Sequence, residues 1–282
     1  KSEAFFYDLM PIALSNISID HSPSLSRRGD RGYSIQAFQG SIIHVVGPND
    51  AGKACLLNLF TTHKDLSPGH VNPSPHLRIL NVPHDPVFVK QLGFHGNLTF
   101  GVARMDGSDP DIKRSKRILR RLSLDKDWML QLLEKEHQEA KPSSEDDEDS
   151  SVEEEKASYS CLKTGADPEE EEEEEEEELI WVERMSTSER KRFQLARAFI
   201  YAPEVLILHR PIDALDPSLS NVILEIMREY VDNRGFETYN DQCQRPKTII
   251  FSGGSGKRNS ISDFVWRISE ENGIVVEPRR MG

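Results

Sequence analysis

The sequence predicts an α/β fold built on a doubly wound, mostly parallel sheet. Short apolar runs alternate with segments of helical periodicity, as expected for parallel strands buried on both faces. The runs are 42–46, 79–82, 205–208 and 248–251. The N-terminal part and the runs 265–268 and 274–276 are expected to add antiparallel strands, and residues 111–133 predict a helical subdomain.

The first apolar run breaks into a turn that has the pattern of a phosphate loop. Glycines let backbone N–H groups turn around an anion, the following helix start adds positive potential, and a lysine reaches the outer phosphates. Gly47, Gly52 and Lys53 satisfy this pattern, whereas Ala54 stands where a hydroxyl normally holds Mg²⁺. The residues expected to line a nucleotide here are Gly47, Asn49, Asp50, Gly52, Lys53, Ala54 and Cys55.

A second segment, residues 185–217, resembles the signature and following strand of the ATP-binding cassette (ABC) family. In that family an LSGGQ signature opens a helix, an apolar strand ends in Asp-Glu-Pro, and a loop reads Ala-Leu-Asp. The helix, the strand, Pro211 and the loop 214–216 match here. The ordered motifs cover nearly all of the chain, so the resemblance implies one exporter-like nucleotide-binding domain over residues 1–282. It also implies nucleotide contacts for His21, at the adenine-stacking position, and for Ser186, and a partner-facing loop at Asp216.

The resemblance also shows which catalytic residues are replaced. His84 stands for the glutamine that contacts metal and water, His209 for the metal-organising aspartate, Arg210 for the water-polarising glutamate, and Gly254 for the γ-phosphate histidine. Mg²⁺ prefers oxygen ligands, and a guanidinium cannot act as a base. We therefore expect no intact catalytic residue, no metal site and no hydrolysis by the family mechanism, which makes this chain a pseudo-ATPase.

Binding of ATP without hydrolysis is left open by two hypotheses. In one, Arg210 takes over part of the neutralising role of the metal, and ATP is held as a static ligand with Lys53. In the other, Asp50 occupies a glycine position of the loop, where its carboxylate repels phosphate or pairs with Lys53 or Arg210 and fills the pocket. The turn itself is expected to survive, because aspartate tolerates positive φ. ATP is therefore a possible cofactor and Mg²⁺ a doubtful one.

The altered signature concerns a partner, since ABC domains work as head-to-tail pairs. The partner is expected to be a second nucleotide-binding domain, identical or different. Thr187 and Ser188 replace two glycines, and Glu189 would place a charge facing the phosphate of the partner's site. Ser186 and Glu189 are also expected to form a capping box at the helix start, whatever the role of the signature toward a partner.

An acidic tract interrupts the segment before the signature. Residues 134–178 hold 22 Asp/Glu and 4 Lys, a net charge of −18, so with −13 for the whole chain the remainder carries +5. Blocks of like charge usually stay disordered, and we expect a disordered insertion. It could be a solvated spacer, a tether to a basic partner or a clamp on the basic remainder.

Other features of the sequence concern the compartment and the membrane context of the chain. Three cysteines without metal spacing indicate a reducing compartment, and Cys55 is expected to be a small buried residue. No apolar run is long enough to span a bilayer, so a transmembrane domain would lie in the same longer chain or in another subunit, with this domain on the cytosolic face. The chain begins at Lys1, which suggests a processed terminus or a piece of a longer polypeptide.

The loop from His84 to Asn97 corresponds to the groove that receives a helix of the membrane domain in the family. Its apolar residues, Val87, Phe88, Val89, Leu92 and Phe94, could serve that contact or simply pack the loop onto its own domain.

Three functions follow from these expectations. The first is a degenerate, hydrolysis-deficient ABC domain with a regulatory or structural role in a transporter-like assembly. The second is an ATP-hydrolysing transporter subunit that works through a composite site with a partner cassette. The third is a nucleotide-free scaffold that recruits a basic partner through the acidic tract. A nucleic-acid partner is not expected, because no long coiled-coil insertion separates the phosphate loop from the signature.

Overall fold

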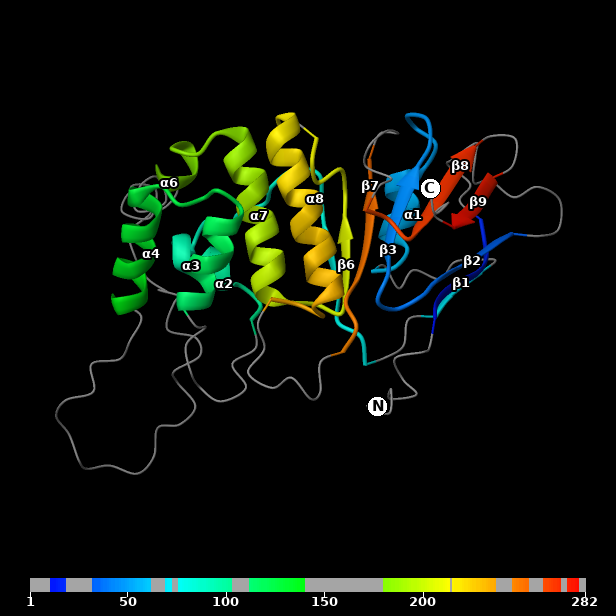
Figure 1. The fold of residues 1–282 in the computed structure, drawn as a ribbon, viewed down its shortest axis with the longest axis horizontal. Coiled ribbons are helices and arrows are strands. Elements are labelled where there is room, and N and C mark those ends of the chain that lie inside the picture. The colour runs from blue at the N-terminus through cyan, green and yellow to red at the C-terminus, as the bar shows by residue number, and fades with distance from the viewer. Residues whose placement is uncertain are drawn as a thin grey trace, which may run out of the picture. The chain divides into compact units, whose positions relative to one another are not determined.

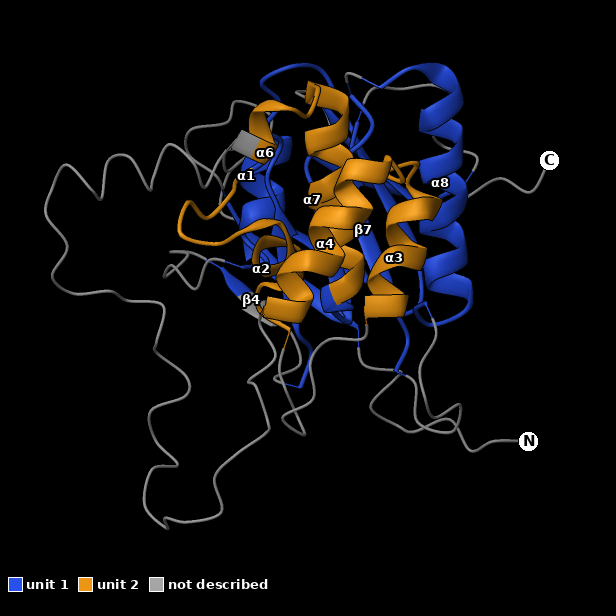
Figure 2. Cartoon of the chain, turned by 90° about the vertical axis from the view of Figure 1, so that its left-hand side faces the viewer, with its two compact units in different colours: residues 1–86, 201–282 blue, residues 87–200 orange. Residues whose placement is uncertain are grey.

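A computed structural model describes ten stretches of the chain: residues 11–18, 32–61, 69–72, 76–102, 112–139, 180–213, 215–236, 245–253, 261–269 and 273–278. The chain divides into two compact units, which Figure 2 distinguishes by colour. The first unit comprises residues 1–86 and 201–282, and the second comprises residues 87–200.

The first unit is built on a six-stranded sheet with the order β5-β6-β7-β3-β8-β9 (Figure 1). Its parallel strands include β3 (Ile42–Val46), β5 (Ile79–Val82), β6 (Val205–Leu208) and β7 (Thr248–Ser252). All residues of β3, β6 and β7 are buried, as strands covered on both faces require. The four strands predicted from apolar runs therefore form, and the mostly parallel α/β fold is confirmed.

One expectation about the end of the chain is wrong. β8 (Phe264–Ser269) runs parallel to β3, and only β9 (Gly273–Pro278), which pairs with β8, is antiparallel. A hairpin fixes the relative direction of its own two strands but not the direction of the pair against the sheet. Asp263 joins the start of β8 to the start of β3, since its carboxylate Oδ2 accepts from the N–H of Ile42 at 2.8 Å and its own N–H donates to the carbonyl of Ile42 at 2.8 Å.

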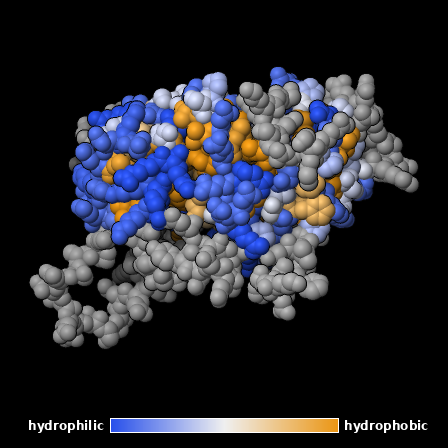
Figure 3. All heavy atoms as spheres, in the orientation of Figure 1, coloured by the Kyte–Doolittle hydropathy of each residue, from blue (hydrophilic) through white to orange (hydrophobic). Residues whose placement is uncertain are grey.

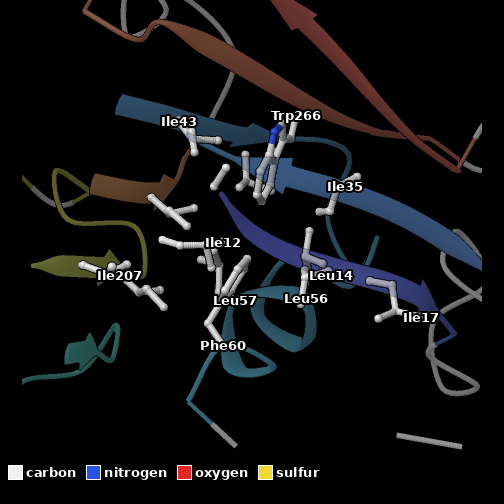
Figure 4. Close-up of a cluster of buried hydrophobic side chains, with 14 of the residues drawn as sticks. Ile12, Leu14, Ile17, Ile35, Ile43, Leu56, Leu57, Phe60, Ile207 and Trp266 are labelled. Carbon is white, nitrogen blue, oxygen red and sulfur yellow. The ribbon is translucent and has the colours of Figure 1, made fainter. Parts of the chain in front are cut away.

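A second, antiparallel sheet has the order β2-β1-β4, from β1 (Ile12–Ile17), β2 (Tyr33–Ala37) and β4 (His70–Asn72). Apolar side chains from this sheet, from helix α1 (Lys53–Asn58) and from one face of the six-stranded sheet form one core (Figure 4). Leu56, Leu57, Phe60 and Trp266 are at most 2% exposed in it. Helix α1 is therefore held by the burial of one short apolar face.

Helix α8 (Pro217–Asp232) completes the described helices of this unit and contacts β7. Asp216 caps its start, since Oδ2 accepts from the N–H of Leu219 at 3.3 Å, and Pro217 occupies the first turn, where proline is well tolerated. Buried Met227 and Tyr230 lie on its packed face.

The second unit is helical over its described residues. Its elements are α2 (Phe94–Thr99), α3 (Ile112–Arg121), α4 (Asp127–Glu139), α6 (Ile180–Glu183) and α7 (Thr187–Tyr201), whose last residue belongs to the first unit. Phe94, Trp181 and Phe193 form an aromatic cluster, with ring centroids 5.0 to 5.3 Å apart. The predicted helical subdomain thus forms around this cluster.

The acidic tract is described only in its first six residues, 134–139, which are the last turns of α4. Residues 140–178 lie outside the described part of the chain. Among the described helices, none has the length and apolar character needed to cross a bilayer.

Candidate nucleotide site

The phosphate loop occupies residues 47–52, between β3 and α1. At Gly47 a Cβ atom would come within 2.8 Å of the carbonyl oxygen of Ile268, so only glycine lets the loop leave the sheet this close to β8. Asp50 and Gly52 have φ values of 61° and 85°, both in the left-handed region. The turn expected at Asp50 therefore forms with an aspartate in a glycine position.

Lys53 bends back over the loop that precedes it. Its Nζ donates to the carbonyl oxygens of Gly47 at 2.8 Å and Pro48 at 2.5 Å. Burial lowers the pKa of Lys53, the positive charge of Arg210 lowers it further, and Asp50 acts in the opposite direction. The charges of Arg210 and Asp50 thus act on the pKa of Lys53, although the hydrogen bonds of its ammonium group within the described part of the chain go to the loop backbone.

The other predicted loop residues differ in exposure. Asn49, Asp50, Ala54 and Cys55 are exposed, whereas Gly52 is half-buried. The expectation that Cys55 is buried is wrong, and its thiol is free. The reason is the position of Cys55 on α1, whose buried residues are the two leucines that follow it.

His84, His209 and Arg210 follow β5 and β6, neighbouring parallel strands whose carboxyl ends meet at one edge of the sheet. The N–H of His209 donates to the carbonyl of Val82 at 3.0 Å, which continues the strand pairing by one residue. Burial, and then the neighbouring His84, lower the pKa of His209, so its imidazole is neutral at pH 7. Its Nε2 is buried without a hydrogen bond among the described residues.

Arg210 adopts φ 50°, and both its backbone and its side chain are hydrogen-bonded. Its N–H donates to the Ser252 hydroxyl at 3.2 Å, and its Nε donates to the Asp213 carboxylate at 2.5 Å. Arg210 therefore pairs with Asp213 rather than with Asp50 in the described structure. The guanidinium side chain remains 54% exposed.

These residues do not fit a bound Mg²⁺ ion. The ion prefers an octahedron of oxygen ligands at short distance, but Ala54 offers no oxygen, His209 offers a neutral imidazole, and Arg210 adds a positive charge. In the residues that the structure describes, no group of three or more His, Cys, Asp or Glu side chains could hold a metal. The chemistry of the available donors, together with Lys53, favours an anion over a dication.

Three of the predicted positions lie outside the residues that the structure describes. His21 and Gly254 are outside the described residues, as is Ala214 of the Ala-Leu-Asp loop. Asp216 is exposed, and hydrogen bonds from Ser218 and then from the N–H of Leu219 lower its pKa. Asp216 thus serves as a helix cap, and its predicted role toward a partner stays a prediction.

The signature forms the capping box. The Glu189 carboxylate accepts from the Ser186 N–H at 2.9 Å and from its hydroxyl at 3.0 Å, and that hydroxyl accepts from the Glu189 N–H at 3.3 Å. Glu189 also pairs with Lys126 at 2.7 Å and is only 6% exposed. Although burial opposes ionisation, the bonds from Lys126 and Ser186 keep the pKa of Glu189 below its ordinary value. The Glu189 carboxylate is therefore engaged within its own unit, and its predicted effect on a partner's phosphate stays a prediction, whereas Thr187 is exposed.

The loop after β5 packs mainly within its own unit. Phe94 is fully buried, and Phe88 lies with its ring centroid 5.4 Å from Trp181. Asn97 ties the loop together, because its Oδ1 accepts from the N–H of Val89 at 2.8 Å and its Nδ2 donates to the carbonyl of Val89 at 3.0 Å. Val87 is 58% exposed, so among the apolar residues of this loop it is the one best placed to meet another molecule.

Apolar side chains also reach the surface elsewhere, among hydrophilic ones, on the face shown in Figure 3. Across the described residues the most exposed large ones besides Val87 are Phe100 and Phe38. They stand singly in the sequence, which is common at protein surfaces.

Three contacts of the site were not predicted from the sequence. The partner of Arg210 is Asp213, three residues on, a spacing that could have suggested an ion pair. Ser252 directly follows the predicted strand 248–251 and could have been placed at the same sheet edge. Nothing in the sequence indicates that Lys126 meets Glu189, since 62 residues separate them.

Comparison with known proteins identifies the family of the chain. Residues 31–213 match the family model described as ABC transporter. No curated protein matches the sequence.

Three solved structures share the fold at low identity, and the chain covers 96% of its own length in each alignment. One is a metal-chelate type ABC transporter in an inward-facing conformation, at 14% identity, TM-score 0.58 and 84% of that chain. Another is an ATP-binding cassette of an ABC transporter in its ADP conformation, at 15% identity, TM-score 0.56 and 92%. The third is an ATP-binding cassette in a dimeric post-hydrolysis state with ADP and Pi, at 12% identity, TM-score 0.61 and 100%. Identities this low show the fold alone.

Proposed function

Because the chain belongs to the ABC transporter family, we propose that it is a nucleotide-binding cassette that has lost hydrolysis at its own catalytic site. Its role is then regulatory or structural, in an assembly resembling a transporter. The observation that carries this proposal is the residue at the end of β6, where the family places its catalytic glutamate and this chain has Arg210.

Hydrolysis of ATP needs a water molecule that is positioned and deprotonated, and a metal that neutralises the transferred phosphoryl group. Arg210 cannot take a proton from water. Its N–H donates to Ser252 and its side chain pairs with Asp213, and neighbouring His209 is half-buried. Neither group supplies the missing carboxylate.

Nucleotide binding is supported by what the loop retains. The left-handed residues Asp50 and Gly52 keep the turn open, and the ammonium group of Lys53 lies over the carbonyl of Gly47. One structural neighbour holds ADP and Pi in a dimer of cassettes. We extend to this chain the binding of a nucleotide and the pairing with a second cassette, identical or different.

We further propose that this cassette works at the cytosolic face of a membrane, beside a transmembrane domain of the same longer chain or of another subunit. One structural neighbour is an ABC transporter in an inward-facing conformation. Val87 in the loop after β5 offers an exposed apolar contact for such a domain.

The test is phosphate release by the purified chain in saturating ATP and Mg²⁺. Active enzymes turn over at about 10 per second, and we expect a rate at least about a thousandfold lower, because both the base and the metal ligands are absent. The triple variant Ala54→Ser, His209→Asp, Arg210→Glu restores the base and two metal ligands, leaves His84 and Gly254 unchanged, and is the comparison in which turnover should rise. Wild-type turnover near the ordinary range would overturn the proposal.

A second candidate function draws on the burial of Glu189. Since its charge is paired inside its own unit, the exposed residues of the signature start are the neutral Ser186 and Thr187. A partner cassette with an intact site could therefore hydrolyse ATP against this signature. Phosphate release that appears only on adding a second, catalytically intact cassette, and that Ser186→Glu abolishes, would select this function.

A further inference from the structure

Arg210 is anchored at the same sheet edge as the phosphate loop. β6 lies two strands from β3, across β7, a separation of about 10 Å between the strands. Ser252, which accepts the Arg210 N–H at 3.2 Å, is paired in register with Val45, two residues before Gly47. The backbone of Arg210 is thus fixed beside the loop by the sheet itself and does not depend on a ligand.

The guanidinium group is oriented as well as anchored. Only its Nε atom is engaged, by Asp213 at 2.5 Å, and within the described residues neither terminal nitrogen makes a hydrogen bond. Holding Nε leaves the planar fork of Nη1 and Nη2 free to bind an anion in a bidentate manner. Asp213 is a positioning residue in this arrangement, because it acts through Arg210.

The balance of charge at these positions differs from that of the family in a specific way. A magnesium ion together with the family's aspartate and glutamate sums to zero. His209, neutral, and Arg210, positive, sum to +1 without any metal, and Asp213, which is paired with Arg210 at 2.5 Å, brings the sum of the three to zero. Replacing the aspartate alone would have left an uncompensated carboxylate beside the phosphates, whereas the present set balances its charges without a metal. A dication would meet repulsion from both Arg210 and Lys53.

We infer that this site is built for a nucleoside triphosphate free of Mg²⁺, with the Arg210 guanidinium in the place of the metal and Lys53 on the outer phosphates. The inference rests on the proposed function, since it specifies the form of the nucleotide that the cassette binds. One part of the competing hypothesis is excluded in the described structure, because Arg210 is paired with Asp213 and not with Asp50.

The experiment is an equilibrium titration of the full chain with ATP, once in excess EDTA and once in excess Mg²⁺, at equal ionic strength. We expect the affinity in EDTA to equal or exceed that in Mg²⁺. Tighter binding in Mg²⁺ would overturn the inference but leave the proposed function standing. Absence of binding in both buffers would overturn the inference and the nucleotide-binding part of the proposed function together.

Two variants assign the effect to the guanidinium. Arg210→Gln should weaken binding in EDTA about tenfold or more, the usual effect of losing charge-assisted hydrogen bonds, with a smaller loss in Mg²⁺. Arg120→Gln removes the same charge from an exposed position on α3 and should leave the affinity unchanged. Equal effects of the two variants would refute the role of Arg210, and unchanged circular dichroism would show that both variants fold.

Discussion

The buried carboxylate of Glu204 gives the most quantitative test of the first unit. It lies just before β6, is 5% exposed, and accepts from the Arg78 backbone N–H and Nε at 3.0 Å each and from Nη2 at 2.9 Å. The Lys247 Nζ lies 3.3 Å away on the other side. Glu204 thus connects the starts of β5, β6 and β7, at the opposite edge of the sheet from the phosphate loop.

The contribution of Glu204 follows from its titration. Burial alone would raise its pKa, but the Arg78 bonds and the Lys247 charge lower it from 4.5 to about 2. A difference of roughly 2.5 pKa units corresponds to about 3.4 kcal/mol of stability. Because the folded-state pKa is the lower one, this stability is complete well above pH 4.5 and is lost as the pH falls toward 2. At pH 3 about 1.4 kcal/mol should remain.

The perturbation is Glu204→Gln, measured by urea unfolding of variant and wild type at pH 7 and pH 3. We expect the variant to lose about 3 kcal/mol at pH 7 and about 1 to 2 kcal/mol at pH 3. Glu225→Gln, at an exposed position of α8, is the matched control and should change stability by less than about 0.5 kcal/mol at either pH. An equal loss for Glu204→Gln at both pH values would refute the reasoning, because a purely steric effect does not titrate.

Two other outcomes follow from the site. Iodoacetamide should alkylate the exposed thiol of Cys55 in the native chain, and mass spectrometry of the peptide that contains Cys55 would measure the modification. ATP in EDTA should slow this reaction. Modification that requires denaturant would contradict the exposed position of Cys55 on α1. Ser186→Ala removes the hydroxyl of the capping box and should cost about 1 kcal/mol in urea unfolding, whereas Thr187→Ala, at the next exposed position, should cost less than half as much.

Four strands of the six-stranded sheet, β3, β5, β6 and β7, could be predicted because each is a short, mostly apolar run, as is typical of strands in a parallel sheet. The direction of β8 could not, because it depends on Asp263 meeting Ile42, a contact between residues 221 apart. The same limit applies to Glu204 and to Glu189. A buried charge looks like any other charge in the sequence until its partner is known, since a paired carboxylate can be enclosed where an unpaired one cannot.

The candidate site was predictable at the level of residue types, because the phosphate loop and the strand ends keep their spacing. The sequence could not show which charges pair, since Asp50 and Asp213 are both carboxylates within reach of a flexible arginine. In the described structure Arg210 has φ 50°, its N–H donates to Ser252, and its Nε pairs with Asp213, three residues on.

The replaced residues of the site are best understood as a set rather than as independent losses. Arg210→Glu alone would place a second carboxylate against Asp213 and, without metal ligands at positions 54 and 209, would leave both uncompensated beside the phosphates. His209→Asp alone would give Arg210 a second acidic partner and divert its fork from the nucleotide. Either of these two reversions toward the family pattern therefore makes the site a poorer anion site before it becomes a metal site. Because the charges of these residues compensate one another, a single substitution disturbs anion binding without restoring metal binding. The test of lost chemistry therefore needs the triple variant.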